Sequence, residues 1–451
     1  MASSTTDIDA GQFSRSTSEN MSDLGSPRRL STGLWTAAYN EPPEQAKAEP
    51  KESIARSGFS AHICGKSLNT ASKRVIRATY LYGSVHGAVD QLLPACFKAL
   101  ERDMGFTPQS LGFVSSVARV SHVLTCPIWG VIIDCCGRRR IFSCTALGWG
   151  AAISAIFYAT QQSHIVPIMC VLGVFMAAMG PLSQKVIAQE IPENCPQQHK
   201  RQQGGQRFSL RDTAYVFSNG SVWVMLIMGI LNGIPRSAIH FSTMYFQYCN
   251  IPDWWASFIV SSSWIAAMIV APVIGLTGDF IHSRHPHHGR QCLAQVCIVA
   301  RCVLMTVMLT CVPRESESLW IFLVLAILIG FLAGWPGVGV NRPILTEIVH
   351  PDHRATTFAL VSCLEGVGAA LLGAPIVGYL CEHVFGYVKP PHGAHIHSAT
   401  IIRGNARAIS LSMLCMTVAP WLLSIVAYGV LHLTYKFDSH HGADHAGMHL
   451  P

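Results

Sequence analysis

Ionisable residues lie inside long apolar stretches of this sequence, where a charge is costly and usually faces a bundle interior or a water-filled cavity. Asp90 lies 16 positions after Arg74, and Arg119 lies 15 positions before Asp134. At ~1.5 Å per residue, both side chains would lie about 22–24 Å from the same end of neighbouring antiparallel helices. We therefore expect Asp90 and Arg119 to meet. Asp90 is the first candidate for proton coupling or substrate recognition, and a purely structural ion pair is the alternative.

Two further charged residues fall near the middle of their apolar stretches. Arg301 and Glu365 would lie about 14–15 Å from a stretch end. An arginine at this depth suits an anionic or zwitterionic group of a substrate. Arg301 and Glu365 are therefore both candidates for a role in transport. The alternative is that the two side chains neutralise each other inside the bundle. Arg236 and His240 are four positions apart and share a helix face. They are candidates to line a substrate path, or they lie near the outer rim.

The composition identifies the elements that hold these residues. The chain has 451 residues, of which 50% are hydrophobic and only 13% charged, and its mean hydropathy is +0.34. A soluble domain carries roughly a quarter charged residues. The sequence therefore predicts an all-α polytopic membrane protein with the lipid bilayer as its surroundings. The net charge of +7 is explained by basic loops on one side of the membrane, and no nucleic-acid partner is expected.

Apolar runs of spanning length divide the chain into parts. A disordered tail is predicted at 1–72, a four-helix N-terminal bundle at 73–187, a polar loop at 188–220, a six-helix C-terminal bundle at 221–434 and a His-rich tail at 435–451. The ten predicted spans run over roughly 75–97, 110–133, 141–160, 164–187, 221–248, 254–277, 292–312, 319–340, 355–384 and 407–433. The basic loops predict that both termini and the 188–220 loop are cytoplasmic, in either a plasma or an internal membrane.

A loop signature recurs at the same helix end in both halves. Gly130 and Asp134 end one span before Gly137, Arg138 and Arg139, and the spacing of four recurs from Gly275 to Asp279. Such repetition is typical of transporters built from related halves. The signature resembles the loop between helices 2 and 3 of the major facilitator superfamily. The stretches 90–100, 105–119 and 341–380 resemble its spinster-like branch, so the similarity covers most of residues 75–390.

The resemblance implies roles for these loop residues. In that family the loop joins the two halves on the cytoplasmic side in the outward-open state, so these residues are expected to control conformation. Arg342 and Glu347, at the cytoplasmic end of their span, are expected partners in a similar gate. Family members have twelve helices, and here the fifth and sixth are absent. The protein is either a natural ten-helix form or the product of a gene model that omits an exon.

The leading hypothesis is a secondary active transporter of a small organic solute, working by alternating access, with proton coupling as one option. The alternatives are a truncated, non-transporting membrane protein that binds lipid or a partner, and a lysolipid carrier. The tracts at 282–290 and 439–449 are His-rich but have no set of Cys partners, so neither is predicted to bind metal. No nucleotide-binding or hydrolase motif occurs, and we expect neither an enzyme nor a cofactor.

Overall fold

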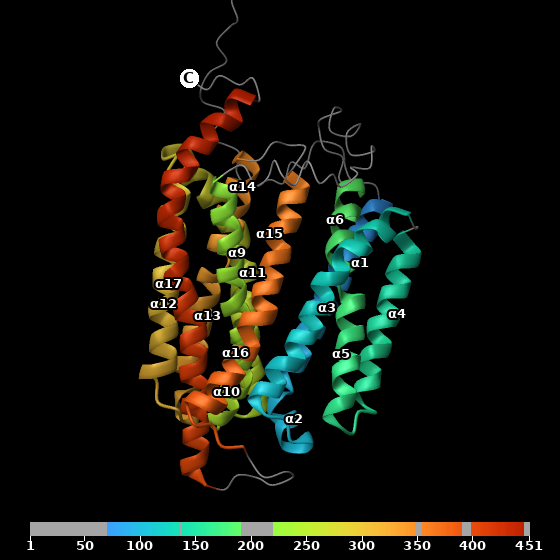
Figure 1. The fold of residues 1–451 in the computed structure, drawn as a ribbon, viewed down its shortest axis with the longest axis vertical. Helices are drawn as coiled ribbons and strands as arrows, with labels where there is room; N and C mark the ends of the chain where they lie inside the picture. The colour runs from blue at the N-terminus through green and yellow to red at the C-terminus, as the bar shows by residue number, and fades with distance from the viewer. Residues whose placement is uncertain (1–69, 136–137, 191–219, 349–353, 390–397, 446–451) are drawn as a thin grey trace, which may run out of the picture. The chain divides into compact units, whose positions relative to one another are not determined.

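The computed structural model describes residues 70–135, 138–190, 220–348, 354–389 and 398–445, all of which belong to one structural unit, Ser67–Pro451. Within these ranges every regular element is a helix, which confirms the all-α prediction (Figure 1). The first group of helices consists of α1 (Thr70–Ala95), α2 (Phe97–Met104), α3 (Pro108–Cys135), α4 (Arg138–Ile156), α5 (Gln162–Met176) and α6 (Met179–Glu190).

The second group follows the undescribed residues 191–219. It consists of α9 (Gly220–Ala238), η2 (Ile239–Phe241), α10 (Ser242–Tyr248), α11 (Asp253–Arg284), α12 (Gly289–Thr306), η3 (Val307–Cys311), η4 (Ser316–Ser318), α13 (Leu319–Ala333), η5 (Trp335–Asn341), α14 (Arg342–Ile348), α15 (Arg354–Gly368), η6 (Ala369–Gly373), α16 (Ala374–Tyr379), η7 (Leu380–Val384) and α17 (Ala399–His445).

The helices are those of a multi-pass membrane protein. Eight segments of the described chain are long and apolar enough to cross a bilayer, and α4 contributes a shorter apolar helix. Large apolar side chains point outward, such as Phe157 (88% exposed) and Met268 (68% exposed), as lipid-facing side chains do. The predicted count of ten spans is not confirmed. The region predicted as the first span is helical in α1, but polar residues such as His86 and Asp90 leave it less apolar than the eight segments.

Several helix boundaries differ from the prediction. The first span is predicted to end at 97, whereas helix α1 ends at Ala95 and α2 follows as a separate helix. The span at 164–187 is divided into α5 and α6, and 221–248 tightens to a 3₁₀ turn at η2. Helix α17 continues to His445, past its predicted end at 433. Apolar composition sets the extent of a stretch, but it does not mark where the backbone hydrogen bonding changes type.

The turn between α2 and α3 is encoded locally. Gly105 ends α2 with φ of 66°, a left-handed conformation that glycine adopts without strain. Pro108 then opens α3, where its missing N–H costs nothing. The Thr107 N–H donates to Ser110 Oγ at 2.7 Å, and the Ser110 N–H donates to Thr107 Oγ1 at 3.2 Å. This turn orients α2 against the second group.

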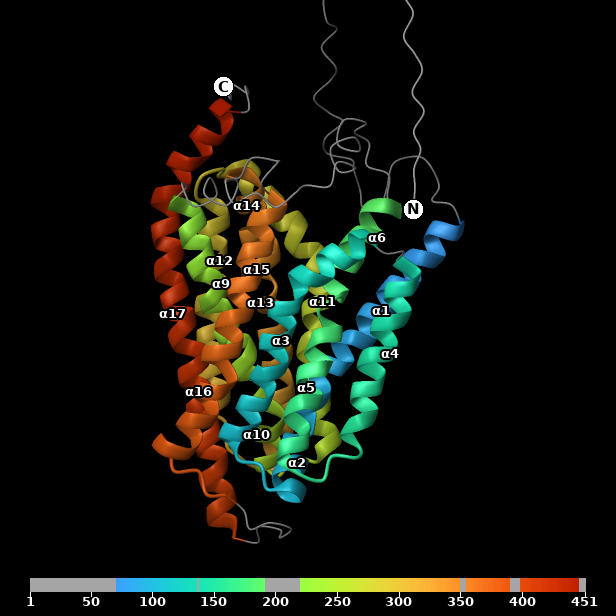
Figure 2. The ribbon, with the colours of Figure 1, turned by 45° about the vertical axis from the view of Figure 1, so that its right-hand side comes forward.

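Helices α1, α4, α5 and α6 pack mainly within the first group, and α9–α17 pack mainly on one another, which forms the two-bundle architecture (Figures 1 and 2). Helix α3 connects the two, since it packs on α15, η6 and α16. Glycines allow this close approach: a Cβ at Gly112 would lie 2.4 Å from the Ala374 carbonyl oxygen, and one at Gly378 would lie 2.4 Å from that of Pro108.

The helices of both groups run between two ends of the molecule. Figures 1 and 2 show α2 and α10 at one end and α14 at the other. We name these the α2 end and the α14 end.

Candidate functional site

Asp90 on α1 and Arg119 on α3 form an ion pair, as their predicted depths required. Arg119 Nη2 donates to both Asp90 carboxylate oxygens, at 3.4 Å each. The two side chains are only 31% and 19% exposed. The pair therefore links two helices of the first group and lies mostly out of water.

The second group supplies the neighbours of this pair. His240, on η2, is buried and interacts electrostatically with Asp90, as does Arg236. His240 Nδ1 has no hydrogen-bond partner among the described residues. A buried polar nitrogen without a partner is costly, which marks a group available to a proton, a water or a ligand. The polar cluster thus includes residues of both groups.

Glu365 pairs with Arg236 and not with Arg301. Arg236 Nη1 lies 3.5 Å from Glu365 Oε1, across the contact between α9 and α15. The expected alternative, mutual neutralisation of Arg301 and Glu365, is therefore wrong. Depth along a helix is readable from sequence, but the direction in which a side chain points around the helix axis depends on packing.

Arg301 on α12 has no carboxylate partner among the described residues. Its guanidinium lies 4.2 Å from the ring centroid of Trp421 on α17. Its Nε is buried and has no hydrogen-bond partner among the described residues. Trp421, 1% exposed, was not singled out from the sequence, because one tryptophan in an apolar run has no distinguishing signal.

A cavity of about 470 Å³ brings several of these residues together. All of its lining residues belong to the second group, from α9, α10, α11, α12, α13, α15, α17 and the segments between them. Three arginines and one carboxylate line it, namely Arg236, Arg301, Arg342 and Glu365. The remainder is largely apolar, and includes Phe246, Met305, Met308, Ile329 and Trp264. Such a cavity suits a ligand with an anionic group and an apolar part.

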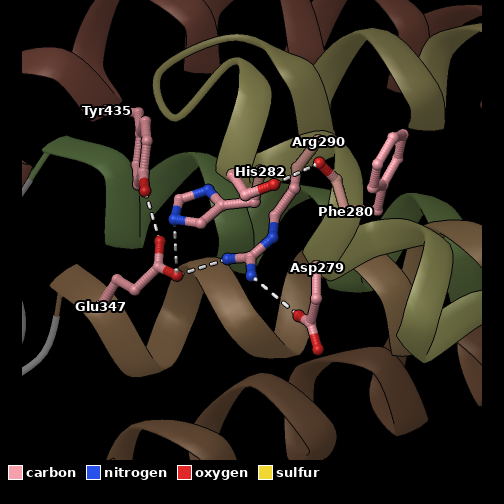
Figure 3. A network of polar contacts seen from close by, with 7 residues as sticks. Asp279, Phe280, His282, Arg290, Glu347 and Tyr435 are labelled. Carbon is pink, nitrogen blue, oxygen red and sulfur yellow. Dashed lines mark hydrogen bonds and ion pairs between the residues drawn. The ribbon is translucent and has the colours of Figure 1, made fainter. Parts of the chain in front are cut away.

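A second polar network lies at the α14 end (Figure 3). Arg290, at the start of α12, pairs with Asp279 at 3.3 Å and also with Glu347. Glu347 also receives the Tyr435 hydroxyl and lies 3.7 Å from His282. The network therefore joins α11, α12, α14 and α17 within the second group. The sequence did not single out Arg290, although it follows Asp279 by 11 positions and is its partner.

The other residues predicted to control conformation lie in several parts of the structure. Arg342 lines the cavity, whereas Glu347 belongs to the network at the α14 end. Gly130 lies on α3 and Gly275 on α11, and a Cβ at either would meet nothing within 4 Å. Neither glycine is therefore required by packing in this conformation. Gly137 and the side chains of Asp134, Arg138 and Arg139 lie outside the described residues.

Contacts at the α2 end join the two groups. The Lys98 ammonium on α2 donates to the Gln247 carbonyl at 2.8 Å. The Gln109 N–H, in the first turn of α3, donates to Glu382 Oε1 at 2.6 Å. By contrast, the ion pairs described at the α14 end stay within the second group. Among the described residues, the polar contacts between groups therefore concentrate at the α2 end.

Comparisons with known proteins agree with this architecture. The family model of the Major Facilitator Superfamily matches residues 79–196. No curated protein matches the sequence. A bacterial homolog of the human lysosomal transporter Spinster has a similar fold in its inward-facing, unoccupied conformation, with a TM-score of 0.60 at 10% identity over 82% of this chain and 99% of that chain. Its inward-facing, occupied conformation gives 0.60 at 11% identity, over 83% and 99%.

The nucleoside transporter NupG is also similar, with a TM-score of 0.53 at 14% identity over 82% of this chain and 99% of that chain. The fold is that of major facilitator transporters, and the resemblance to the spinster-like branch is confirmed at that level. Together the comparisons support a membrane transporter. The absence of a fifth and sixth helix stays a prediction.

Proposed function

We propose that this protein is a secondary transporter that moves an anionic, partly apolar organic solute by alternating access. The observation that carries the proposal is the cavity, where three arginines accompany a single carboxylate. Within it, Arg301 lies against Trp421, and its buried Nε has no partner among the described residues. A charge held inside a membrane bundle without a counter-ion is costly. A bound anion would offset that cost, so the site favours anions over neutral solutes.

The apolar lining supports a solute with a hydrocarbon part. Met305 and Met308 adapt to a flexible chain because their side chains are unbranched and polarisable, and Phe246 adds apolar surface. A phosphate or carboxylate headgroup would lie on Arg301, with its chain along these residues. A free nucleoside, the substrate class named for NupG, has no charge to place there.

Asp90, Arg119, Arg236, His240 and Glu365 are the proposed path for coupling to a proton or to the substrate. Each of the two ion pairs holds a carboxylate beside an arginine, and His240 lies buried with one unpartnered nitrogen. A solute anion that competes for Arg236 would free Glu365 to accept a proton. Substrate and proton would then enter the site together.

The conformation fits one state of the proposed cycle. Polar contacts between the groups concentrate at the α2 end, which we assign to the non-cytoplasmic side from the basic loops at the other end. Both termini are then cytoplasmic, and the conformation is inward-facing. In the opposite state the end of α3 and the start of α4, with Asp279, Arg342 and Glu347, would bring the groups together at the α14 end.

The test is uptake by proteoliposomes that contain the full chain. Tritiated lysophosphatidate and tritiated uridine serve as charged amphiphilic and neutral probes. We expect saturable uptake of lysophosphatidate and none of uridine. Arg301→Gln should raise KM about 10- to 150-fold, because a charge-assisted hydrogen bond contributes about 1.5–3 kcal/mol. Arg403→Gln is the matched control, since Arg403 is 71% exposed and pairs with Glu315.

Two results would count against the proposal. If uridine enters and lysophosphatidate does not, the anionic assignment is wrong. If neither probe moves, and stable protein shows no flux with other amphiphilic anions, the non-transporting alternative holds.

A further inference from the structure

A closed ring of three side chains lies at the α2 end, outside the cavity and the ion pairs described above. Oε2 of Glu101, on α2, lies 2.7 Å from the Tyr248 hydroxyl oxygen, and its Oε1 contacts the Tyr387 hydroxyl. The two hydroxyls also lie 2.7 Å from each other. Glu101, Tyr248 and Tyr387 are 2%, 3% and 8% exposed, so the ring is shielded from water.

Counting protons indicates the charge state of this ring. Three oxygen–oxygen contacts need three protons, and each tyrosine supplies one. If Glu101 is ionised, both hydroxyls donate to it and their own 2.7 Å contact contains no hydrogen. If Glu101 carries a proton, the carboxyl donates to Tyr248, Tyr248 to Tyr387, and Tyr387 back to Glu101. Only the neutral carboxyl satisfies every contact.

Among the described residues, the titratable groups that interact with Glu101 are Lys98 on α2, Lys389 beyond Tyr387, Cys381 on η7 and the two tyrosines. Asp253, at the start of α11, and Arg102 act on Lys98. Lys98 donates to the Gln247 carbonyl and lies 4.9 Å from the Tyr248 ring centroid. Burial raises the pKa of Glu101, while the two tyrosines, Lys98 and Lys389 oppose that shift. The burial effect is the largest, which agrees with the proton count.

The ring also joins the two groups of helices. Glu101 belongs to α2, whereas Tyr248 ends α10 and Tyr387 follows η7. If the groups separate at this end, as the proposed alternating access requires, the carboxyl leaves both hydroxyls and meets water. Its burial and its partners are then lost together.

We propose that Glu101 is a proton-binding residue of a gate at the α2 end. It holds a proton while the ring is closed, and it passes that proton to water on that side when α2 moves away from Tyr248 and Tyr387. The O–H bond of the carboxyl breaks, a carboxylate remains, and water accepts the proton, so charge balances. Acid on that side therefore favours the closed gate, and alkali favours the open one. This inference rests on the proposed alternating access, and it adds a proton site separate from Asp90.

The proton can be detected directly by infrared spectroscopy of the purified full chain. At neutral pH in D₂O we expect the C=O stretch of a protonated carboxyl, weakened in Glu101→Gln. Glu382→Gln is the matched control, because Glu382 also lies at the α2 end and accepts the Gln109 N–H across the two groups. It should leave the band unchanged. A wild-type spectrum that Glu101→Gln does not alter would overturn the proposal.

The gate is tested by hydrogen exchange of residues 97–105, corrected for the intrinsic effect of pH. Protection of these amides in the wild type should be higher at pH 5.5 than at pH 8. The protection factor should change by up to tenfold for each unit between the pKa of Glu101 in the closed state and its pKa in the open state. Glu101→Gln, which stays neutral, should show the same protection at both pH values. Tyr387→Phe, which removes one hydroxyl, should lower protection at pH 5.5 even if Glu101→Gln folds poorly. Equal wild-type protection at both pH values would refute the gate.

Neither measurement needs a substrate. If the band and the pH-dependent protection are present while no probe is transported, the gate stands and the proposed substrate fails. If probes are transported and both signals are absent, transport stands and the gate fails.

Discussion

Replacing Asp90 by asparagine leaves the Arg119 guanidinium without its counter-ion inside the first group of helices. Two unit charges 3.4 Å apart interact by about 5 kcal/mol at an effective dielectric constant of ~20. Because the side chains are 19% and 31% exposed, water screens part of that attraction. We therefore expect each single substitution, Asp90→Asn or Arg119→Gln, to lower the free energy of unfolding by about 3 kcal/mol.

The double variant Asp90→Asn/Arg119→Gln tests the origin of that loss. With both charges removed no ion is stranded, so most of the stability should return, and the coupling energy should be about 2–4 kcal/mol. The assay is unfolding by sodium dodecyl sulfate, followed by circular dichroism in mixed micelles. The exposed pair Arg403–Glu315, 3.7 Å apart and 71% and 56% exposed, is the control and should show no measurable coupling.

Additive single effects, with coupling below about 0.5 kcal/mol, would refute the reasoning. They would mean that water or another group already neutralises Arg119. Proteoliposome flux by the same variants separates the two roles of Asp90. If the double variant is stable and transports, but its transport no longer depends on pH, Asp90 has a role in proton coupling. If its transport depends on pH as in the wild type, the ion pair has a structural role.

Three other predictions concern distinct parts of the molecule. Glu347→Gln should lower the unfolding free energy by about 2–4 kcal/mol, measured in the same assay, because Arg290 is 7% exposed and, among the described residues, would keep Asp279 as its one carboxylate partner. Gly112→Val should separate α3 from α16, since a Cβ there would lie 2.4 Å from the Ala374 carbonyl oxygen, and hydrogen exchange of residues 108–116 should increase. Burial raises the pKa of Glu101, so the folded state binds the proton more tightly than the unfolded state. Stability should therefore fall as pH rises from the ordinary value of 4.5 through the raised one, and Glu101→Gln should flatten that slope in chemical denaturation.

The sequence anticipated the pairing of Asp90 with Arg119, because helix rise converts residue number into depth. It did not anticipate the partner of Glu365. Arg301 and Arg236 both carry a charge that could neutralise this carboxylate, and the choice depends on how α9, α12 and α15 rotate about their axes. In the structure Arg236 takes the carboxylate and Arg301 turns to Trp421.

The ring of Glu101, Tyr248 and Tyr387 shows the same limit more strongly. In sequence, Glu101 stands between Lys98 and Arg102 in a short charged stretch, and nothing there marks it as a proton site. Its two hydrogen-bond partners lie 147 and 286 positions away. Nothing local marks Tyr248 or Tyr387 as polar partners, because tyrosines commonly lie at the ends of membrane helices.

Composition and the length of the apolar runs alone determined that this is a helical, multi-pass membrane protein, since a bilayer accepts few other structures. The repeated spacing of Gly130–Asp134 and Gly275–Asp279 added the resemblance to a two-bundle transporter. Only the tertiary structure decided which charges are paired, where the cavity lies and which end joins the two groups. Those features depend on side chains that converge from distant helices, and helix packing, not local sequence, sets their direction.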